Sequence, residues 1–222
     1  MASEVDICNL ALGHLGDNAT VASLDPPEGS AQAEHCARFY PMARDALLEL
    51  HDWNFATRRA QLALLGSAWS EWQYSYEMPS DCLNVIAVLA SDATDDYSAP
   101  LNLGFTQTGV VNTGQGVYTP QPYVCEVDDL GRQVVYTNQE DAVLRYVAYV
   151  TDTTKFSPLF TQTLSWQLAA LLAGPIIKGD AGAAEAKRCL QMAGAYMAKA
   201  TESDAQQRRV NPTQSVGWMA NR

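Results

Sequence analysis

The sequence is poor in the residues on which many enzyme and metal sites depend. It contains only three histidines, His14, His35 and His51. None stands at a metal-ligand spacing from another histidine or from a cysteine, and neighbouring His35 and Cys36 fall on different faces of a helix. We therefore interpret the histidines as solvated or hydrogen-bonded side chains and expect no metal and no cofactor. A thiol nucleophile at Cys36, with His35 or His51 as its base, is the alternative to a buried cysteine.

Paired cysteines and long apolar runs are also missing. The five cysteines are scattered singly, which is typical of buried thiols in a reducing compartment rather than of a disulfide framework. No apolar run is long enough to span a bilayer, and no charged segment followed by an apolar one resembles a secretion leader. We expect a soluble protein that has no membrane partner and is not secreted through a cleaved signal.

Positive charge is scarce and unevenly placed. The net charge is -11, yet no acidic residue follows Asp204, while Arg208, Arg209 and Arg222 do. The last 18 residues thus carry +3 and residues 1–204 carry -14. A body this acidic repels phosphate, so it is unsuited to gripping nucleic acid. The charge suits either simple solubility or a ring through which DNA slides without sticking.

Motifs for nucleotides and nucleic acids are absent as well. The glycine-rich run 109–116 lacks the lysine of a phosphate-binding loop. The basic pairs Arg58–Arg59 and Arg208–Arg209 are isolated rather than arranged in a stripe.

Helical patterns occupy both ends of the chain. Ser3 with Asp6 predicts a capped first helix that ends at Gly16, and Ser30 predicts the start of a second, kinked or broken near Pro41. Ser157 followed by Pro158 predicts a third helix, which is kinked or ended by Gly174–Pro175. Asp180 is the expected cap of a fourth.

The middle of the chain has the alternation and β-branched content of strands. Strands are expected at 83–89, 123–127, 133–136 and 142–149, with a turn at 129–132. Residues 58–65 are expected to form a short helix or an extended arm. The long stretch 91–122 contains many glycines, prolines and aspartates, and we expect it to reach a neighbouring molecule.

These patterns predict an α+β fold in which both ends of the chain build one helical bundle. The bundle is expected to comprise residues 1–79 and 156–204, with an inserted antiparallel β domain at 80–155 and an extended tail at 205–222. The tail contains apolar residues that a merely solvated segment does not need, so we expect it to bind a partner. The expected binding residues are Arg208, Arg209, Trp218 and Met219.

Aromatic residues are concentrated where helical spacing gives way to alternation. We expect them to be buried in one structural seam that joins the bundle to the inserted sheet. The residues of this predicted seam are Trp53, Phe55, Trp69, Trp72, Tyr74 and Tyr76.

Six segments, in order along nearly the whole chain, resemble the tail tubular protein A family of short-tailed bacteriophages. They are Asp6–Leu12, Asp52–Ala56, Trp72–Tyr76, Met78–Leu83, Tyr149–Asp152 and Phe156–Phe160. The resemblance implies a head-to-tail adaptor in the virion that is assembled in the host cytoplasm. It implies a dodecameric ring that binds the portal protein above and the nozzle, tail tubular protein B, below, with DNA passing through the channel.

Two alternatives remain open at this stage. One is a virion-associated cell-wall hydrolase, in which two carboxylates across a cleft act as acid and base; the candidates are Glu71, Glu77 and Asp81. The other is a soluble host accessory protein that does not assemble into a ring. The adaptor interpretation predicts no catalytic residue.

Overall fold

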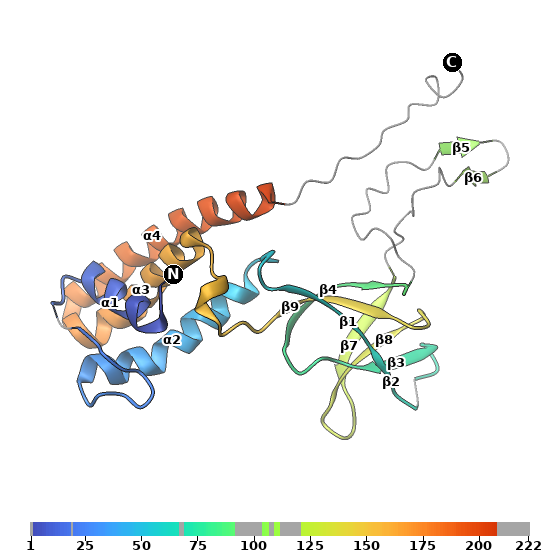
Figure 1. Ribbon diagram of the computed structural model, residues 1–222, viewed down its shortest axis with the longest axis horizontal. Coiled ribbons are helices and arrows are strands. Elements are labelled where there is room, and N and C mark those ends of the chain that lie inside the picture. Colours follow the sequence, from blue (N-terminus) through green and yellow to red (C-terminus); the bar gives the residue numbers. More distant parts are fainter. Residues whose placement is uncertain are drawn as a thin grey trace, which may run out of the picture. The chain divides into compact units, whose positions relative to one another are not determined.

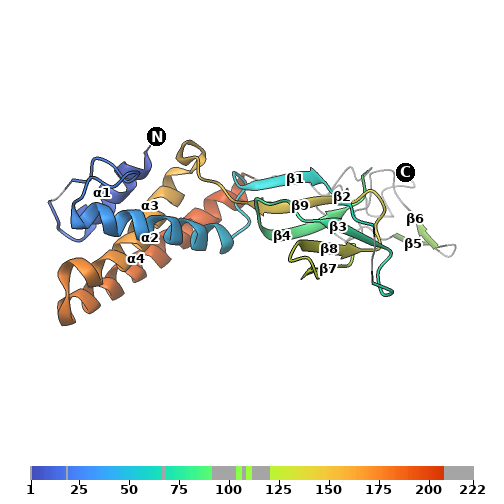
Figure 2. The ribbon, with the colours of Figure 1, turned by 90° about the horizontal axis from the view of Figure 1, so that it is seen from below.

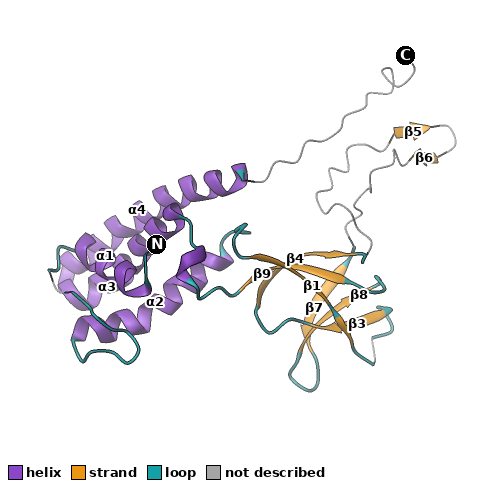
Figure 3. Cartoon of the chain, viewed as in Figure 1, coloured by secondary structure: helices purple, strands orange, loops and turns teal. Residues whose placement is uncertain are grey.

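The computed structural model describes residues 2–18, 20–66, 69–91, 104–106, 109–111 and 121–207. It shows the expected α+β fold, with helices from both ends of the chain and antiparallel strands between them (Figure 1). The chain divides into two compact units. The helical unit contains the residues up to Ala56 and those from Tyr149 to the end of the last helix, and the β unit runs from Thr57 to Ala148. Figure 3 separates the two classes of structure by colour.

The helical unit is built from α1 (Glu4–His14), α2 (Ala31–Glu49), α3 (Pro158–Ile177) and α4 (Gly179–Gln206), with a 3-10 turn at Thr153–Lys155. The three serines predicted as caps do cap their helices. Ser3 forms a capping box with Asp6, Ser30 accepts the backbone N–H of Ala33, and Ser157 accepts that of Phe160.

The proline and aspartate signals were less reliable. α2 and α3 are each a single helix with a proline inside, so neither breaks at Pro41 or ends at Pro175. Asp180 is not the cap of α4 and lies in its first turn. Lys178 caps the end of α3 and the start of α4 with a φ of 62°, so the two helices share one boundary residue and no side-chain cap fits between them.

The β unit contains two main antiparallel sheets. The first has the order β1–β9–β4, in which β1 is Thr57–Gln61, β9 is Val143–Ala148 and β4 is Cys82–Leu89. Figure 2 shows β9 between its two neighbours. The second has the order β2–β3–β8–β7, which are Ala63–Leu64, Tyr74–Glu77, Gln133–Thr137 and Tyr123–Val127.

One core serves both sheets. Tyr76 and Val135 from the second sheet and Val88, Leu144 and Tyr146 from the first belong to the same buried cluster. β1 and β2 are separated only by Leu62, which is also buried in this cluster. The chain therefore passes from one sheet to the other at that residue.

The division between the units differs from the predicted boundaries at 79/80 and 155/156. β1, β2 and β3 precede residue 80 but pair with β9 and β8, so they belong to the β unit. Residues 58–65 accordingly contain most of β1 and all of β2, so the extended arm is the correct one of the two expectations and the short helix is not. The start of the predicted tail is also different, because α4 continues to Gln206.

Most of the predicted loop 91–122 lies outside the described residues. Within it, β5 (Gly104–Thr106) and β6 (Gly109–Val111) pair with each other in antiparallel register. Among the helices in the part of the chain that the structure describes, none is long and apolar enough to cross a membrane.

Candidate functional site

The predicted partner-binding residues Arg208, Arg209, Trp218 and Met219 lie outside the described residues. Their placement stays a prediction. The last turn of α4 is described, and there Asp204 is buried and accepts hydrogen bonds from Asn54. Its carboxylate accepts the Asn54 backbone N–H at 3.1 Å and the side-chain amide at 3.0 Å, while His51 Nε2 lies 3.3 Å away. These bonds fix the end of α4 to the segment that follows α2.

The predicted seam does not form one cluster, because its six aromatic residues are divided between the two units. Trp53 and Phe55 belong to the helical unit, where they pack with Phe156, just before α3, and Phe160, in its first turn. The ring centroids are 5.0 Å apart for Trp53 and Phe160, 5.7 Å for Phe55 and Phe156, and 4.8 Å for Phe156 and Phe160. We call these four residues the junction cluster, since they hold the chain segments on either side of the insertion.

Two further contacts strengthen the helical unit near the insertion. The Trp53 indole Nε1 donates to the carbonyl oxygen of Leu47 at 2.8 Å. The buried Arg44 of α2 donates to the hydroxyl of Tyr149, the first residue after the β unit, and pairs with Asp45 at 2.8 Å. The burial of Arg44 could not be predicted from the sequence, because its position in the helix is compatible with an exposed face.

The other four residues of the predicted seam lie in the β unit, on both faces of the second sheet. Tyr74 and Tyr76 alternate with Ser75 on β3 and pack with the inner core, their ring centroids 6.3 Å apart. Trp69 instead belongs to the segment between β2 and β3 and is 60 % exposed. The expectation that all six side chains are buried is therefore wrong for Trp69.

A small pocket forms around this exposed tryptophan. It is lined by Trp69, Ser70, Glu71 and Trp72 from the β2–β3 segment and by Glu126 from β7, and its volume is ≈ 240 Å³. We call it the acid–aromatic pocket. Trp69 Nε1 donates to the hydroxyl of Tyr136 on β8 at 3.1 Å, which ties the segment to the sheet.

The acid–aromatic pocket is suited to a cation. Glu71 and Glu126 are exposed, and neither has a basic partner in the part of the chain that the structure describes. Indole faces attract cations, and carboxylates accept charge-assisted hydrogen bonds from guanidinium or ammonium groups. The surrounding β unit is itself acidic, with eleven Asp and Glu residues against four arginines and no lysine.

Glu126 is a pocket residue that no sequence pattern indicated. Its alternation with Cys125 predicts that the two side chains point to opposite faces of β7. The order β2–β3–β8–β7, which no sequence pattern reveals, is needed to bring that strand and the tryptophan segment into one site.

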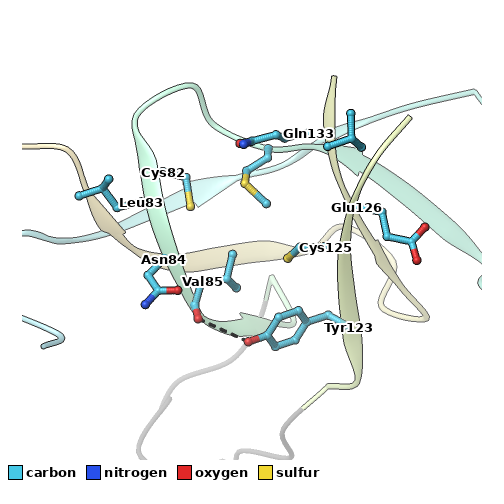
Figure 4. Close-up of a pocket in the computed structure, with 10 residues that line it drawn as sticks. Cys82, Leu83, Asn84, Val85, Tyr123, Cys125, Glu126 and Gln133 are labelled. Atoms are coloured by element: carbon cyan, nitrogen blue, oxygen red, sulfur yellow. Dashed lines mark hydrogen bonds between the residues drawn. The ribbon is translucent and has the colours of Figure 1, made fainter. Parts of the chain in front are cut away.

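A second cavity lies where the two main sheets present their outer strands. It has a volume of ≈ 350 Å³ and is lined mainly by β4 and β7. Figure 4 shows Cys82 and Cys125 facing the space between the strands, Glu126 pointing away from it, and the Tyr123 hydroxyl reaching the Val85 carbonyl oxygen at 3.4 Å. We call it the edge cleft. Outer strands can accept an added strand through their backbone groups.

The thiols of the edge cleft are not activated nucleophiles. Burial, followed by the influence of Cys125 and Asp81, raises the pKa of Cys82 to about 11. Burial also raises the pKa of Cys125. Both side chains are thus held in the thiol form at neutral pH, which is the less reactive form of cysteine.

The thiol pair Cys36 and Cys8 is equally unsuited to the alternative nucleophilic role. Both are fully buried, on α2 and α1. The pKa of Cys8 is raised, first by its hydrogen bond with Cys36 and then by burial. The pKa of Cys36 is lowered, because the same hydrogen bond outweighs the opposite effect of burial. The described contacts of His51 are with Asp204 and Trp53, not with Cys36.

The carboxylates considered for hydrolysis occupy different settings. Asp81 is paired with Arg58 at 2.7 Å and accepts the hydroxyl of Tyr146 at 2.9 Å. Burial, and secondarily the Asp81 hydrogen bond, raises the pKa of Tyr146 to about 12. Glu77 is exposed on β3 opposite Val134, and Glu71 lines the acid–aromatic pocket. Only Glu71 shares a described cavity with a second acid, Glu126.

Metal ligands are not clustered in the described ranges: no group of three His, Cys, Asp or Glu side chains there is placed to hold an ion. His14 stacks on Trp166 with a centroid distance of 3.6 Å, and its Nε2 lies 3.1 Å from the Ser165 hydroxyl. Burial, and to a smaller extent Arg188, lowers the pKa of His14.

Comparison with known proteins identifies no relative: no protein-family model matches the chain, and no curated protein is significantly similar to it.

Proposed function

We propose that the protein is a structural subunit of a phage particle, a head-to-tail adaptor that forms a ring between the portal and the tail nozzle. Its role is geometric rather than catalytic, and DNA passes through the ring without specific binding. The proposal starts from the resemblance to the tail tubular protein A family and extends it to this chain, including its location in the virion and a twelve-fold ring.

The observation that carries the proposal is where the resembling segments lie in the fold. Asp52–Ala56 and Phe156–Phe160 are far apart in sequence, yet together they supply the junction cluster. Tyr149–Asp152 begins with the tyrosine that Arg44 holds. Three of the six resembling segments thus contain residues that fix the two ends of the insertion, which is a similarity of architecture. It supports a shared building block more strongly than scattered matches would.

The surface of the β unit gives a second line of support. It exposes large apolar side chains, with Trp69 60 %, Val127 65 % and Leu130 77 % exposed. It also presents the edge cleft and the acid–aromatic pocket. Exposed apolar side chains beside open strand edges are typical of surfaces that meet other proteins.

The charge distribution is compatible with the proposed channel. Residues 1–204 carry -14, so a closed ring of these chains would repel the DNA backbone rather than bind it. This favours passage over retention.

Assembly with the portal tests the proposal. The purified chain is mixed with the purified portal of the same phage and analysed by sedimentation and electron microscopy. We expect co-sedimentation and a ring of copies that follows the portal symmetry. A chain that stays separate from the portal at all ratios contradicts the adaptor function and favours the accessory protein without a ring.

The hydrolase alternative has its own test. Purified protein is incubated with peptidoglycan, and soluble fragments are measured for the wild type and for Glu71→Gln, Glu77→Gln and Asp81→Asn. The proposal predicts no release by any of them. Cleavage by the wild type that one of these changes abolishes would establish an enzyme instead.

A further inference from the structure

We propose that the acid–aromatic pocket of one copy binds an arginine side chain from residues 208–222 of a neighbouring copy. The inference rests on the proposed ring assembly and names one contact within it. The arginine is supplied by the Arg208–Arg209 pair, which follows the end of α4 at Gln206 by only two residues.

The size of the pocket favours a single side chain over a separate small molecule. Its volume is ≈ 240 Å³, whereas sites for small ligands span roughly 300–1,000 Å³. One long side chain fits such a space, and the backbone of its residue then lies at the entrance of the pocket.

The groups around the pocket favour a guanidinium in particular. Trp69 and Trp72 provide indole rings, and Glu71 and Glu126 provide carboxylates from two separate parts of the β unit. A guanidinium is planar, stacks on aromatic rings and donates in a fork that matches a carboxylate. Both kinds of contact are therefore present in one cavity.

The Trp69 side chain is held in place although it is exposed. Its Nε1 donates to the Tyr136 hydroxyl at 3.1 Å, and Trp72 donates its backbone N–H to the Trp69 carbonyl oxygen at 2.9 Å. A fixed aromatic loses little conformational freedom on binding, which is the property of an interface anchor.

The chain's own charge distribution identifies the occupant. The β unit has a net charge of -7, and residues 208–222 have three arginines and no acid. The two sequences are thus complementary in charge. In a closed ring each contact joins one surface patch to a different patch of the next copy, which is the arrangement that a basic segment and an acidic pocket require.

Binding of a peptide tests the pocket. A fluorescein-labelled peptide of residues 205–222 is titrated into the full-length chain carrying Arg208→Ala and Arg209→Ala, so that the chain's own Arg208–Arg209 pair does not compete. Fluorescence anisotropy is expected to show saturable binding. The double change Glu71→Gln/Glu126→Gln and the single change Trp69→Ala should each weaken it, the former by roughly tenfold or more.

A matched control separates the pocket from general attraction. Asp129→Asn/Glu140→Gln removes the same charge from two exposed residues of the β unit outside the pocket. It should change the affinity no more than about threefold, because exposed charges at a distance are screened. Equal weakening by both pairs, or no peptide binding at all, overturns the proposal. Thermal melting of each variant verifies that the fold is retained.

Mixing two defective chains tests whether the contact joins different copies. The Arg208→Ala/Arg209→Ala chain keeps the pocket, and the Glu71→Gln/Glu126→Gln chain keeps the arginines. Sedimentation velocity should show that the mixture associates more than either chain alone. Peptide binding without such association means that each chain fills its own pocket, which overturns the contact between copies.

The portal experiment remains independent of both tests. Portal docking by the wild type without peptide binding refutes only this contact. Peptide binding without portal docking refutes the adaptor function and leaves the pocket as a site for the basic segment.

Discussion

The helical unit and the β unit use the same kinds of side chain for different purposes. Trp53 is completely buried in the junction cluster and its indole N–H donates to a backbone carbonyl, whereas Trp69 is 60 % exposed beside the exposed carboxylates of Glu71 and Glu126. Arg44 and Asp204 of the helical unit are likewise buried and bonded internally. The comparison indicates that the helical unit is organised to hold the fold and the β unit to present a surface.

The largest expected effect separates the two tryptophans. Trp53→Ala should lower the free energy of unfolding by about 3–5 kcal/mol, since it removes a fully buried aromatic ring. Trp69→Ala should lower it by less than about 1 kcal/mol, because most of that side chain remains in water. Urea unfolding followed by circular dichroism measures both. Similar losses of unfolding free energy for the two variants would contradict the distinction between a helical unit that holds the fold and a β unit that presents a surface.

A smaller effect is expected at the end of α4. Asp204→Ala removes the carboxylate that accepts the half-buried backbone and side-chain N–H groups of Asn54, so it should cost about 1–3 kcal/mol of unfolding free energy. Asp204→Asn keeps one acceptor oxygen and should cost less. Glu202→Gln, at an exposed position of the same helix, is the control and should be neutral. If Asp204→Ala is also neutral in the same urea titration, the helical unit is not fixed by this carboxylate.

The smallest effect concerns pH. The pKa of His14 is lowered from 6.5 in the folded chain, mainly by burial and then by Arg188. As the pH falls below 6.5, the unfolded chain takes up this proton first, so the free energy of unfolding decreases. His14→Gln should therefore reduce the dependence of stability on pH between 8 and 5.5, whatever its effect at pH 8. Parallel curves for wild type and variant contradict this sign.

Local signals predicted the four helices and four of the strands, β4, β7, β8 and β9. Ser3, Ser30 and Ser157 each precede a helix with the appropriate capping geometry, because capping depends on only a few neighbouring residues. β1 could be predicted only as either a short helix or an extended arm, since its sequence Thr57–Gln61 has two adjacent arginines and no apolar alternation. Pairing with β9 makes it a strand, and that pairing is a property of the tertiary structure.

The candidate site could be predicted only in part. The density of aromatic residues drew attention to positions 53–76, but density carries no information about which unit each ring belongs to. Trp53 and Trp69 lie on opposite sides of the boundary at Ala56. The role of Glu126 additionally depends on strand order, so no local reading of its sequence could have joined it to Glu71.

The pairing of β1 with β9 affects how the two parts of the helical unit come together during folding. Thr57, the first residue of the β unit, is the direct partner of Val147, the residue before its last, so the two ends of the inserted unit lie side by side. The two halves of the helical unit are far apart in sequence, but the folded insertion acts between them as a short loop. Most of the entropy of closing that long loop is lost when the sheet forms. After the sheet has formed, α3 and α4 can pack against α1 and α2 as if only a tight turn separated the two pairs in sequence.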